Sequence, residues 1–240
     1  MDLGAGDGEK VKFLIEKALK EEYDFEYIPI DISHSSNLTL AEAIKKISPN
    51  LKMTVLTALY EQGIKWVDEN KKGKNVFLCI GNSLGNLSGA QRREFLEYLK
   101  GHLKKGDMVL LGVDLKKDPE LIRMAYFDNR EHANRFIWNI FARINRELEG
   151  DFDSDNFFTY SYYDPSVGEV LESAISKQEQ IVSIRGQKIG LKKSEPIYVS
   201  RSKKWDCEEM HEEMFDVGMK LTKGFTDHKG YYLEGLYEKI

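Results

Sequence analysis

The sequence predicts an α/β protein, in which a mostly parallel β-sheet has helices on both faces and one inserted α+β domain. Three observations lead to this prediction. Helix and strand patterns alternate along the first half of the chain, a glycine-rich loop precedes the first helix, and the rhythm changes after Asp114. Alternation of helices and strands is typical of parallel sheets, because parallel neighbours need a long crossover connection. At 240 residues the chain can bury a core of this size.

Apolar spacing locates the alternating elements. The runs FEYIPID at 25–31 and NVFLCIG at 75–81 are typical of buried strands, and MVLLGVD at 108–114 follows a Gly-Asp turn as a further strand. QRREFLEYLKGHL at 91–103 has the spacing of an amphipathic helix. A first helix follows the glycines directly, with one apolar face made of Val11, Leu14, Ile15, Ala18 and Leu19.

The chain beyond Asp114 is organised differently. Short strands are predicted near 157–163, 169–176 and 180–184, which suits an α+β insertion. They follow a long helix whose apolar positions are Phe136, Ile137, Ile140, Phe141, Ile144 and Leu148.

The C-terminal part returns to the first domain. From about Cys207 the pattern indicates a helix, and the last apolar run, YYLEGLY, is a strand that could complete the sheet. We therefore predict one domain formed by residues 1–116 and 206–240, and an inserted domain at 117–205.

Composition excludes several function classes. A formal net charge of −5 argues against a nucleic-acid partner, which needs a basic face for phosphate contacts. The two cysteines fit a reducing compartment, and we expect a cytoplasmic monomer acting on a small molecule. We expect no membrane role, since no apolar run reaches the roughly 18 residues of a transmembrane helix, and no signal peptide. The five histidines lack metal-ligand spacing, so we expect no metal site.

The glycine loop predicts the cofactor. Gly4, Gly6 and Gly8 form G-x-G-x-G, whereas the dinucleotide pattern G-x-G-x-x-G would need a glycine at Glu9. Asp31 stands at the expected end of the next strand, where a carboxylate can accept both ribose hydroxyls of an adenosine-containing ligand. This spacing favours S-adenosylmethionine, whose cationic sulfonium suits an acidic loop that would repel a pyrophosphate. An ordinary glycine turn is the alternative.

Six motifs that occur in order along the chain are more specific than the glycine loop alone. They are LGAGDGEK, IPIDIS, LTALYEQGIKWV, LCIGNSLGNLS, KKGDMVLLGVDLKKDPELIRMAY and INRELEGDFD. Together they resemble the amino-acid Nα-methyltransferase family, which includes the ergothioneine-pathway histidine methyltransferase and fungal tryptophan-type relatives. The resemblance implies a Rossmann-like class I methyltransferase fold with an inserted substrate domain. It also implies S-adenosylmethionine-dependent methylation of the α-amine of histidine or another amino acid or derivative.

The resemblance also implies roles for individual residues. Gly4 and Lys10 would contact the methionine end of the cofactor, Asp31 the ribose, and the turn at 58–60 the adenine. Asn86 and Tyr126 would hold the backbone of the substrate amino acid. The implied cofactor contacts are Gly4, Gly6, Lys10, Asp31, Tyr60 and Gly81. Two alternatives remain, namely that Asn86 caps the helix at residue 91 and that Tyr126 is a core residue.

The chain departs from the histidine enzymes of this family at one place. They carry Glu-x-Ser where IYVSRSKKW has Ser200 and Ser202, so the acid that would pair with imidazole is replaced by a hydroxyl. Both serines are candidate substrate contacts, and Glu195 is a candidate replacement for the acid. We therefore expect histidine to be a poor substrate. No general base can be assigned, because bound water or a family tyrosine upstream of residue 1 would both serve.

The start of the chain raises a separate question. Only Met1, Asp2 and Leu3 precede Gly4, whereas a central strand needs about five residues. We expect the first strand and an upstream lid to be missing, through truncation or in a natural minimal form. Two other functions therefore stay open: a catalytically weak S-adenosylmethionine-binding domain, and a nucleotide-dependent oxidoreductase.

Overall fold

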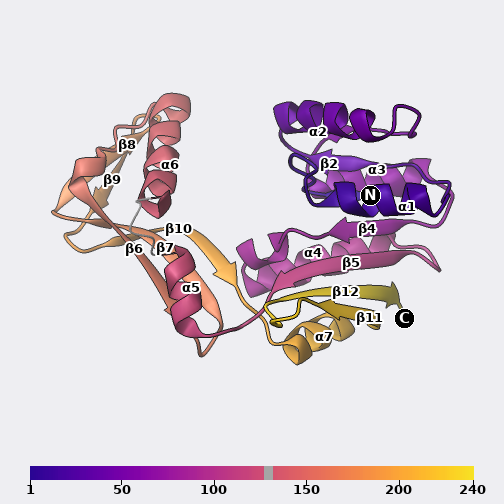
Figure 1. Ribbon diagram of the computed structural model, residues 1–240. Helices are drawn as coiled ribbons and strands as arrows, with labels where there is room; N and C mark the ends of the chain where they lie inside the picture. The colour runs from indigo at the N-terminus through magenta and orange to yellow at the C-terminus, as the bar shows by residue number, and fades with distance from the viewer. Residues whose placement is uncertain (127–131) are drawn as a thin grey trace. The chain divides into compact units, whose positions relative to one another are not determined.

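The computed structural model describes residues 1–126 and 132–240, with side chains from 134 onward in the second part. The chain divides into two compact units (Figure 1). Unit 1 is Met1–Leu115 with Trp205–Ile240, and unit 2 is Lys116–Lys204. No helix in these described ranges is both long enough and apolar enough to cross a membrane.

Unit 1 is built on a seven-stranded sheet in the order β11-β12-β5-β4-β1-β2-β3. The strands from β5 to β3 are parallel, and β12 and β11 add an antiparallel hairpin at one edge. This confirms the predicted α/β class. The strands are β1 Asp2–Leu3, β2 Pro29–Asp31, β3 Leu56–Thr57, β4 Val76–Cys79, β5 Met108–Asp114, β11 Met219–Thr226 and β12 Tyr232–Lys239.

Helices cover both faces of this sheet. Helices α1 and α2 bury Val11, Ile15, Leu40 and Ile44 against one face, and α3, α4 and α7 pack on the other. Strand alternation divides the core accordingly, as Phe77 and Cys79 of β4 point to one cluster and Leu78 to the other. The helices are α1 Val11–Lys20, α2 His34–Ile47, α3 Tyr60–Asn70, α4 Gly89–His102 and α7 Cys207–Asp216, with a 3₁₀ turn η1 at Ser83–Asn86.

The first strand is present, and the expectation that it is missing was wrong. Strand β1 has two residues and lies between β2 and β4. Its flanking residues extend the ladder, because Met1 O accepts from Leu78 N at 2.7 Å and Gly4 N donates to Ile30 O at 2.9 Å. Pairing on both sides satisfies the backbone of so short a strand. The glycine loop therefore follows a central strand after all.

Unit 2 contains a three-stranded antiparallel sheet in the order β10-β7-β6 and a hairpin of β8 and β9. Its core gathers Ile137, Phe141, Phe157, Ala174 and Val182 with the partly buried Phe152 and Trp138. The strands are β6 Phe157–Asp164, β7 Glu169–Ser176, β8 Gln180–Ile184, β9 Gln187–Leu191 and β10 Pro196–Lys203, and the helices are α5 Pro119–Tyr126, α6 His132–Leu148 and the 3₁₀ turn η2 Ser154–Asn156. Strands β9 and β10 had no counterpart among the predicted elements.

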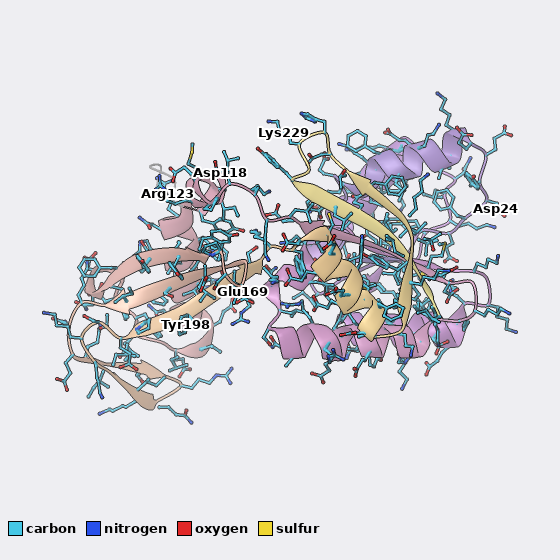
Figure 2. All side chains as sticks on the ribbon, turned by 90° about the horizontal axis from the view of Figure 1, so that it is seen from below. Asp24, Asp118, Arg123, Glu169, Tyr198 and Lys229 are labelled. Carbon is cyan, nitrogen blue, oxygen red and sulfur yellow. The ribbon has the colours of Figure 1, made fainter. Side chains whose placement is uncertain are left out.

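The sheet of unit 2 has two unlike faces. One face carries Phe157 and Ala174 into the core. The other exposes aromatic side chains, including Phe158 and Tyr198, which is 70% exposed (Figure 2). Because side chains alternate along each strand, Ser161, Glu172 and Ser200, which pair across β6, β7 and β10, share the face of Ala174.

Candidate functional site

The glycine loop adopts a backbone that favours glycine at each of its three glycines. Gly4, Gly6 and Gly8 have φ of +72°, +58° and +80°, in the left-handed region where other residues are strained. A Cβ on Gly6 would meet nothing within 4 Å, so the loop presents bare backbone to open space there. Such a surface lets a ligand approach the chain closely.

Asp31 joins this loop to the end of β2. Its Oδ2 accepts the backbone N–H of Gly6 at 3.1 Å, and its Oδ1 accepts that of Ser33 at 2.9 Å. A carboxylate offers about four acceptor positions, so these two bonds leave about half of them for a ligand. Asp31 thus orients the loop and retains acceptor capacity, and its contact with ribose hydroxyls stays a prediction.

A cavity of about 90 Å³ opens beside the loop. Its lining includes an acidic side chain, the buried Asp2, and a basic one, the exposed Lys10. The methionine end of S-adenosylmethionine carries an ammonium and a carboxylate, so these residues fit that group. The lining residues are Asp2, Gly4, Ala5, Gly6, Asp7, Lys10, Val11, Ile80 and Gly81.

Asp2 was missed by sequence reasoning, although it directly precedes the loop. Burial raises the pKa of its carboxyl, and the hydrogen bond from Tyr27 and the nearby Lys10 charge oppose this rise. The Tyr27 hydroxyl donates to Asp2 Oδ2 at 2.8 Å. Lys10 also lies near Gly81, where a Cβ would stand 3.2 Å from the Lys10 Nζ. The loop and the end of β4 are therefore close together at this cavity.

Tyr60 packs directly over Gly4. A Cβ on Gly4 would stand 2.5 Å from the Tyr60 hydroxyl oxygen. The Tyr60 ring contacts Phe95 edge-on, with centroids 5.9 Å apart, and burial raises the pKa of its hydroxyl. Close packing on the loop is what the structure shows for Tyr60, and its contact with adenine stays a prediction.

A second, larger cavity of about 510 Å³ is lined by Tyr60 and Asn86, among others. Asn86 is the last residue of η1 and is exposed. It does not cap α4, because Ser88 accepts the Gln91 N–H in a capping box and fills that role. The full lining is Tyr60, Glu61, Cys79, Ser83, Leu84, Asn86, Leu87, Gln91, Glu94, Phe95 and Tyr98.

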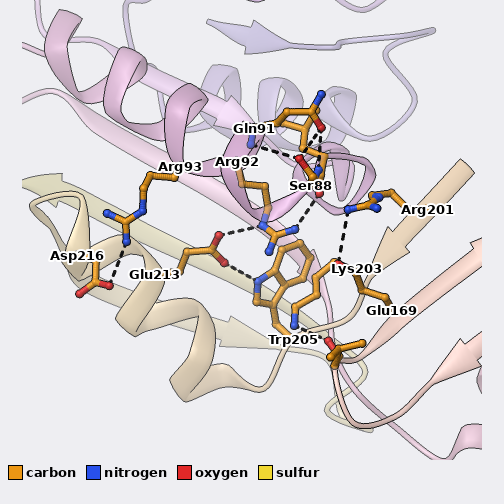
Figure 3. Close-up of polar contacts among 12 residues, drawn as sticks. Ser88, Gln91, Arg92, Arg93, Glu169, Arg201, Lys203, Trp205, Glu213 and Asp216 are labelled. Atoms are coloured by element: carbon orange, nitrogen blue, oxygen red, sulfur yellow. Dashed lines mark hydrogen bonds and ion pairs between the residues drawn. The ribbon is translucent and has the colours of Figure 1, made fainter.

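A buried ion pair holds the loop that carries Asn86 (Figure 3). Arg92 is 7% exposed, and its Nε donates to Glu213 Oε1 at 2.8 Å. Its Nη1 donates to Leu87 O at 2.8 Å, next to Asn86. Glu213 Oε2 in turn accepts from Trp205 Nε1 at 2.9 Å. Sequence reasoning missed this network, and the one available signal was an arginine on the apolar face of α4.

In unit 2, Lys204 brings together two of the predicted substrate residues. Its Nζ donates to the Tyr126 hydroxyl and to Ser202 Oγ, each at 2.8 Å, and lies 4.9 Å from the centre of the Tyr126 ring. Lys204 is 2% exposed, and Tyr126 is half-buried at the end of α5. Tyr126 therefore has a polar partner at its hydroxyl, as a buried core tyrosine would also have, and its contact with the substrate stays a prediction. Lys204 itself was not predicted.

Ser200 has an acidic neighbour that the sequence did not reveal. Its hydroxyl donates to Glu172 Oε2, from the facing position on β7. Glu172 is 8% exposed. Glu195, the candidate replacement acid, instead accepts the Lys192 N–H at 2.7 Å within the turn before β10.

The predicted site residues therefore fall in both units. Unit 1 holds the six cofactor candidates and Asn86, and unit 2 holds Tyr126, Ser200 and Ser202. The side chain of His132 lies outside the described residues. Within the described part of the chain, no group of three or more His, Cys, Asp or Glu residues could hold a metal ion.

Residues 1–239 match the family described as histidine-specific methyltransferase, SAM-dependent. The chain belongs to this family. The match confirms the resemblance drawn from the six motifs, and the cofactor is S-adenosylmethionine. The chain is an S-adenosylmethionine-dependent N-methyltransferase, and its membership supports N-methylation of an amino-acid α-amine rather than a nucleotide-dependent oxidoreduction.

Similar proteins agree with this family. The histidine N-alpha-methyltransferase of Mycolicibacterium smegmatis (strain ATCC 700084 / mc(2)155) is 28% identical over 232 residues, covering 96% of this chain and 72% of that protein. The histidine N-alpha-methyltransferase of Mycobacterium tuberculosis (strain CDC 1551 / Oshkosh) is 32% identical over 157 residues, covering 65% of this chain and 48% of that protein. The CcbJ methyltransferase of Streptomyces caelestis shares the fold, with a TM-score of 0.53 at 12% identity over 99% of this chain and 82% of that chain.

Proposed function

We propose that this chain methylates the α-amine of a free amino acid, with S-adenosylmethionine as the methyl donor. The observation that carries this proposal is the Gly6–Asp31 hydrogen bond beside a cavity lined by Asp2 and Lys10. The proposed cofactor contacts are Gly4, Gly6, Lys10, Asp31, Tyr60 and Gly81. The proposed substrate contacts are Asn86, Tyr126, Ser200 and Ser202.

Different residues are proposed to bind the different polar groups of the cofactor. Asp31 would accept hydrogen bonds from the ribose hydroxyls, while Lys10 and Asp2 would bind the carboxylate and ammonium of the methionine end. S-adenosylmethionine supplies an activated methyl group on a sulfonium. The leaving thioether is neutral, so the chain needs no acid to protonate it.

Hydrogen bonds within unit 2 determine whether its candidate hydroxyls donate or accept. An ammonium donates hydrogen bonds and accepts none, so the Tyr126 and Ser202 oxygens both accept from Lys204, and the Tyr126 hydroxyl keeps its own proton to donate. Donors of this kind suit the carboxylate of an amino acid. Ser200 has the opposite role, since it donates to Glu172 and keeps its lone pairs to accept.

Catalysis would then rest on positioning and on loss of one ammonium proton from the substrate. Holding the nitrogen lone pair in line with a methyl group can lower the barrier by about 7–11 kcal/mol. Asn86 suits the positioning role, because its neutral amide can both donate and accept. No side chain is proposed as the base.

We also propose that the protein acts in the cytoplasm as a monomer on a small molecule and has no nucleic-acid or membrane partner. The net charge of −5 supports this view, since phosphate backbones attract basic faces. Both cysteines are free thiols, in keeping with a reducing compartment.

Mass spectrometry of an amino-acid panel incubated with S-adenosylmethionine tests the proposal. We expect a mass gain of one or more methyl groups on the α-nitrogen of at least one amino acid. Calorimetry with S-adenosylhomocysteine should be run in parallel. Cofactor binding without any methylated product would favour the alternative of a catalytically weak cofactor-binding domain.

A further inference from the structure

We propose that Asn82 is a positioning residue for methyl transfer, which holds the loop that carries Asn86 against the carboxyl end of β5. This inference rests on the proposed function and deepens it, because Asn86 is the proposed contact for the amino-acid substrate. Asn82 itself lines neither of the two cavities described above. It would act through the loop at 82–87, which follows β4.

Asn82 has a backbone conformation that few side chains adopt. Its φ is +55°, in the left-handed region, where glycine is unstrained and asparagine is tolerated better than most other residues. By conformation alone, glycine would fit this position at least as well as asparagine. The backbone thus gives no reason for a side chain here, and the contacts of the amide supply one.

The Asn82 amide connects the loop to the neighbouring strand. Its Oδ1 accepts the backbone N–H of Asp114, the last residue of β5, at 3.0 Å. The two residues are 32 positions apart in the sequence. The amide nitrogen packs on Gly85, where a Cβ would stand 2.6 Å from the Asn82 Nδ2. The amide therefore contacts both β5 and the residue directly before Asn86.

The loop is attached at both ends. Gly85 N donates to Asn82 O at 2.9 Å, which closes the turn on itself. At the far end, Leu87 O accepts from the buried Arg92 at 2.8 Å. The place of Asn86 therefore depends on these two attachments. Loss of the Asn82 bond would release the near end, and a misplacement of about 1 Å in a substrate-positioning group can lower the rate about a hundredfold.

The segment just before Asn82 is held separately. The Tyr232 hydroxyl of β12 donates to Ile80 O at 3.0 Å. It passes β5 at Gly112, where a Cβ would stand 2.5 Å from that hydroxyl oxygen. Gly81, a proposed cofactor contact, follows Ile80 directly. Loss of the Asn82 bond should therefore disturb the substrate contact more than the cofactor contact.

The test compares Asn82→Gly with Asn82→Asp. Glycine adopts the backbone but has no amide, whereas aspartate tolerates the same backbone and keeps an oxygen acceptor for the Asp114 N–H. We expect Asn82→Gly to lower kcat/KM for the preferred amino acid by about tenfold or more, and Asn82→Asp to stay within about threefold of wild type. S-adenosylhomocysteine affinity should stay nearly unchanged in both. Glu22→Gly is the control, because Glu22 is exposed and has a similar φ of +57°.

Gly85→Ala tests the same contact from the other side, and it also serves if Asn82→Gly proves unstable in a thermal melt. The added methyl would displace the Asn82 amide, so we expect this variant to lose methyl transfer as Asn82→Gly does. In the double variant the amide is already absent, so its loss should be no greater than that of the weaker single variant. Additive losses would contradict the inference.

Two further results would overturn it. One is an Asn82→Gly variant that methylates as the wild type does, and the other is a variant that loses cofactor affinity and methyl transfer alike. If the wild type binds S-adenosylhomocysteine but methylates no amino acid, the proposed function fails separately. Hydrogen exchange of the Asp114 amide then decides whether Asn82 holds the loop, because exchange needs no turnover. We expect exchange about tenfold faster or more in Asn82→Gly than in Asn82→Asp, and equal rates would refute the attachment.

Discussion

The backbone N–H of Gly6 donates to Asp31 Oδ2 at 3.1 Å, linking the glycine loop to the end of the neighbouring strand β2. The two residues are 25 positions apart in the sequence. Their contact means that the carboxylate proposed to bind the ribose also shapes the loop. Changes at Asp31 should therefore act on cofactor binding more than on the fold.

Replacing Asp31 with alanine should weaken S-adenosylhomocysteine binding by about 1.5–3 kcal/mol, the usual cost of losing hydrogen bonds to a charged acceptor. Calorimetric titration measures the change. Asp24→Ala is the control, because Asp24 is exposed in the loop before β2 (Figure 2). Equal affinities for wild type and Asp31→Ala would remove the basis for the ribose contact.

Alanine at Gly4 should destabilise the protein more than alanine at Gly6. Both positions have positive φ, which costs an alanine about 1–2 kcal/mol. Only the Gly4 methyl would also collide with the Tyr60 hydroxyl, 2.5 Å away. Tyr60→Phe removes that oxygen and leaves the ring carbon at 3.4 Å, so the double variant with Gly4→Ala should recover the extra loss. Urea denaturation of Gly4→Ala, Gly6→Ala, Tyr60→Phe and the double variant measures the loss of unfolding free energy. Equal losses at both glycines would contradict the packing described.

Asn86→Ala and Tyr126→Phe should each impair methyl transfer and leave S-adenosylhomocysteine affinity nearly intact. Each change removes a polar group proposed to hold the amino-acid substrate, and neither residue lines the cavity beside the glycine loop. Steady-state kinetics with the preferred amino acid, alongside calorimetry, separates the two effects. A variant that loses cofactor binding instead would show that its residue has been given the wrong role.

Arg92 and Glu213 should be strongly coupled energetically. Removing one partner leaves the other charge poorly compensated in a largely buried place, since the side chains are 9% and 21% exposed. In a double-mutant cycle of Arg92→Met and Glu213→Gln, we expect a coupling free energy of about 1–3 kcal/mol by denaturant unfolding.

Arg93 and Asp216 supply the control pair, 3.4 Å apart with side chains 54% and 62% exposed (Figure 3). A surface pair of this kind contributes about 0–1 kcal/mol. If the two cycles give the same coupling, burial does not set the strength of the Arg92 pair.

Asp2→Asn should stabilise the fold and weaken cofactor binding. Burial raises the pKa of Asp2, so the folded state binds its proton more tightly than the unfolded state does. The stability that this group contributes is present at low pH and is lost as pH rises through the raised pKa. The stability of Asp2→Asn relative to wild type should therefore grow from acidic to neutral pH. Denaturant unfolding over that range checks it, and a difference independent of pH would contradict the cause.

Local patterns made much of unit 1 predictable. The strand at 108–114 is observed with those bounds, and the helix after the glycines runs from Val11 to Lys20. Asp31 was predicted from its spacing alone, because the loop, helix and strand that place it are consecutive in the chain. Strand β1 was not predicted, because a two-residue strand forms through pairing with its neighbours and has no apolar run of its own to reveal it.

The rest of the candidate site depends on contacts that no local pattern reveals. Glu172 meets Ser200 across a ladder 28 positions apart, and Lys204 meets Tyr126 across 78. Arg92 and Glu213 are 121 positions apart. Strands β9 and β10 were missed as well, and without the register of β10 on β7 the acid beside Ser200 could not be identified.

The most direct test of the central claim is the incubation of the protein with S-adenosylmethionine carrying a deuterated methyl group and each of the common amino acids, followed by fragment-ion mass spectrometry. We predict transfer of the labelled methyl to the α-nitrogen of at least one amino acid, with loss of transfer in Asp31→Ala at limiting cofactor. Label that appears on another atom, or on no amino acid while the wild type still binds S-adenosylhomocysteine, would contradict the account.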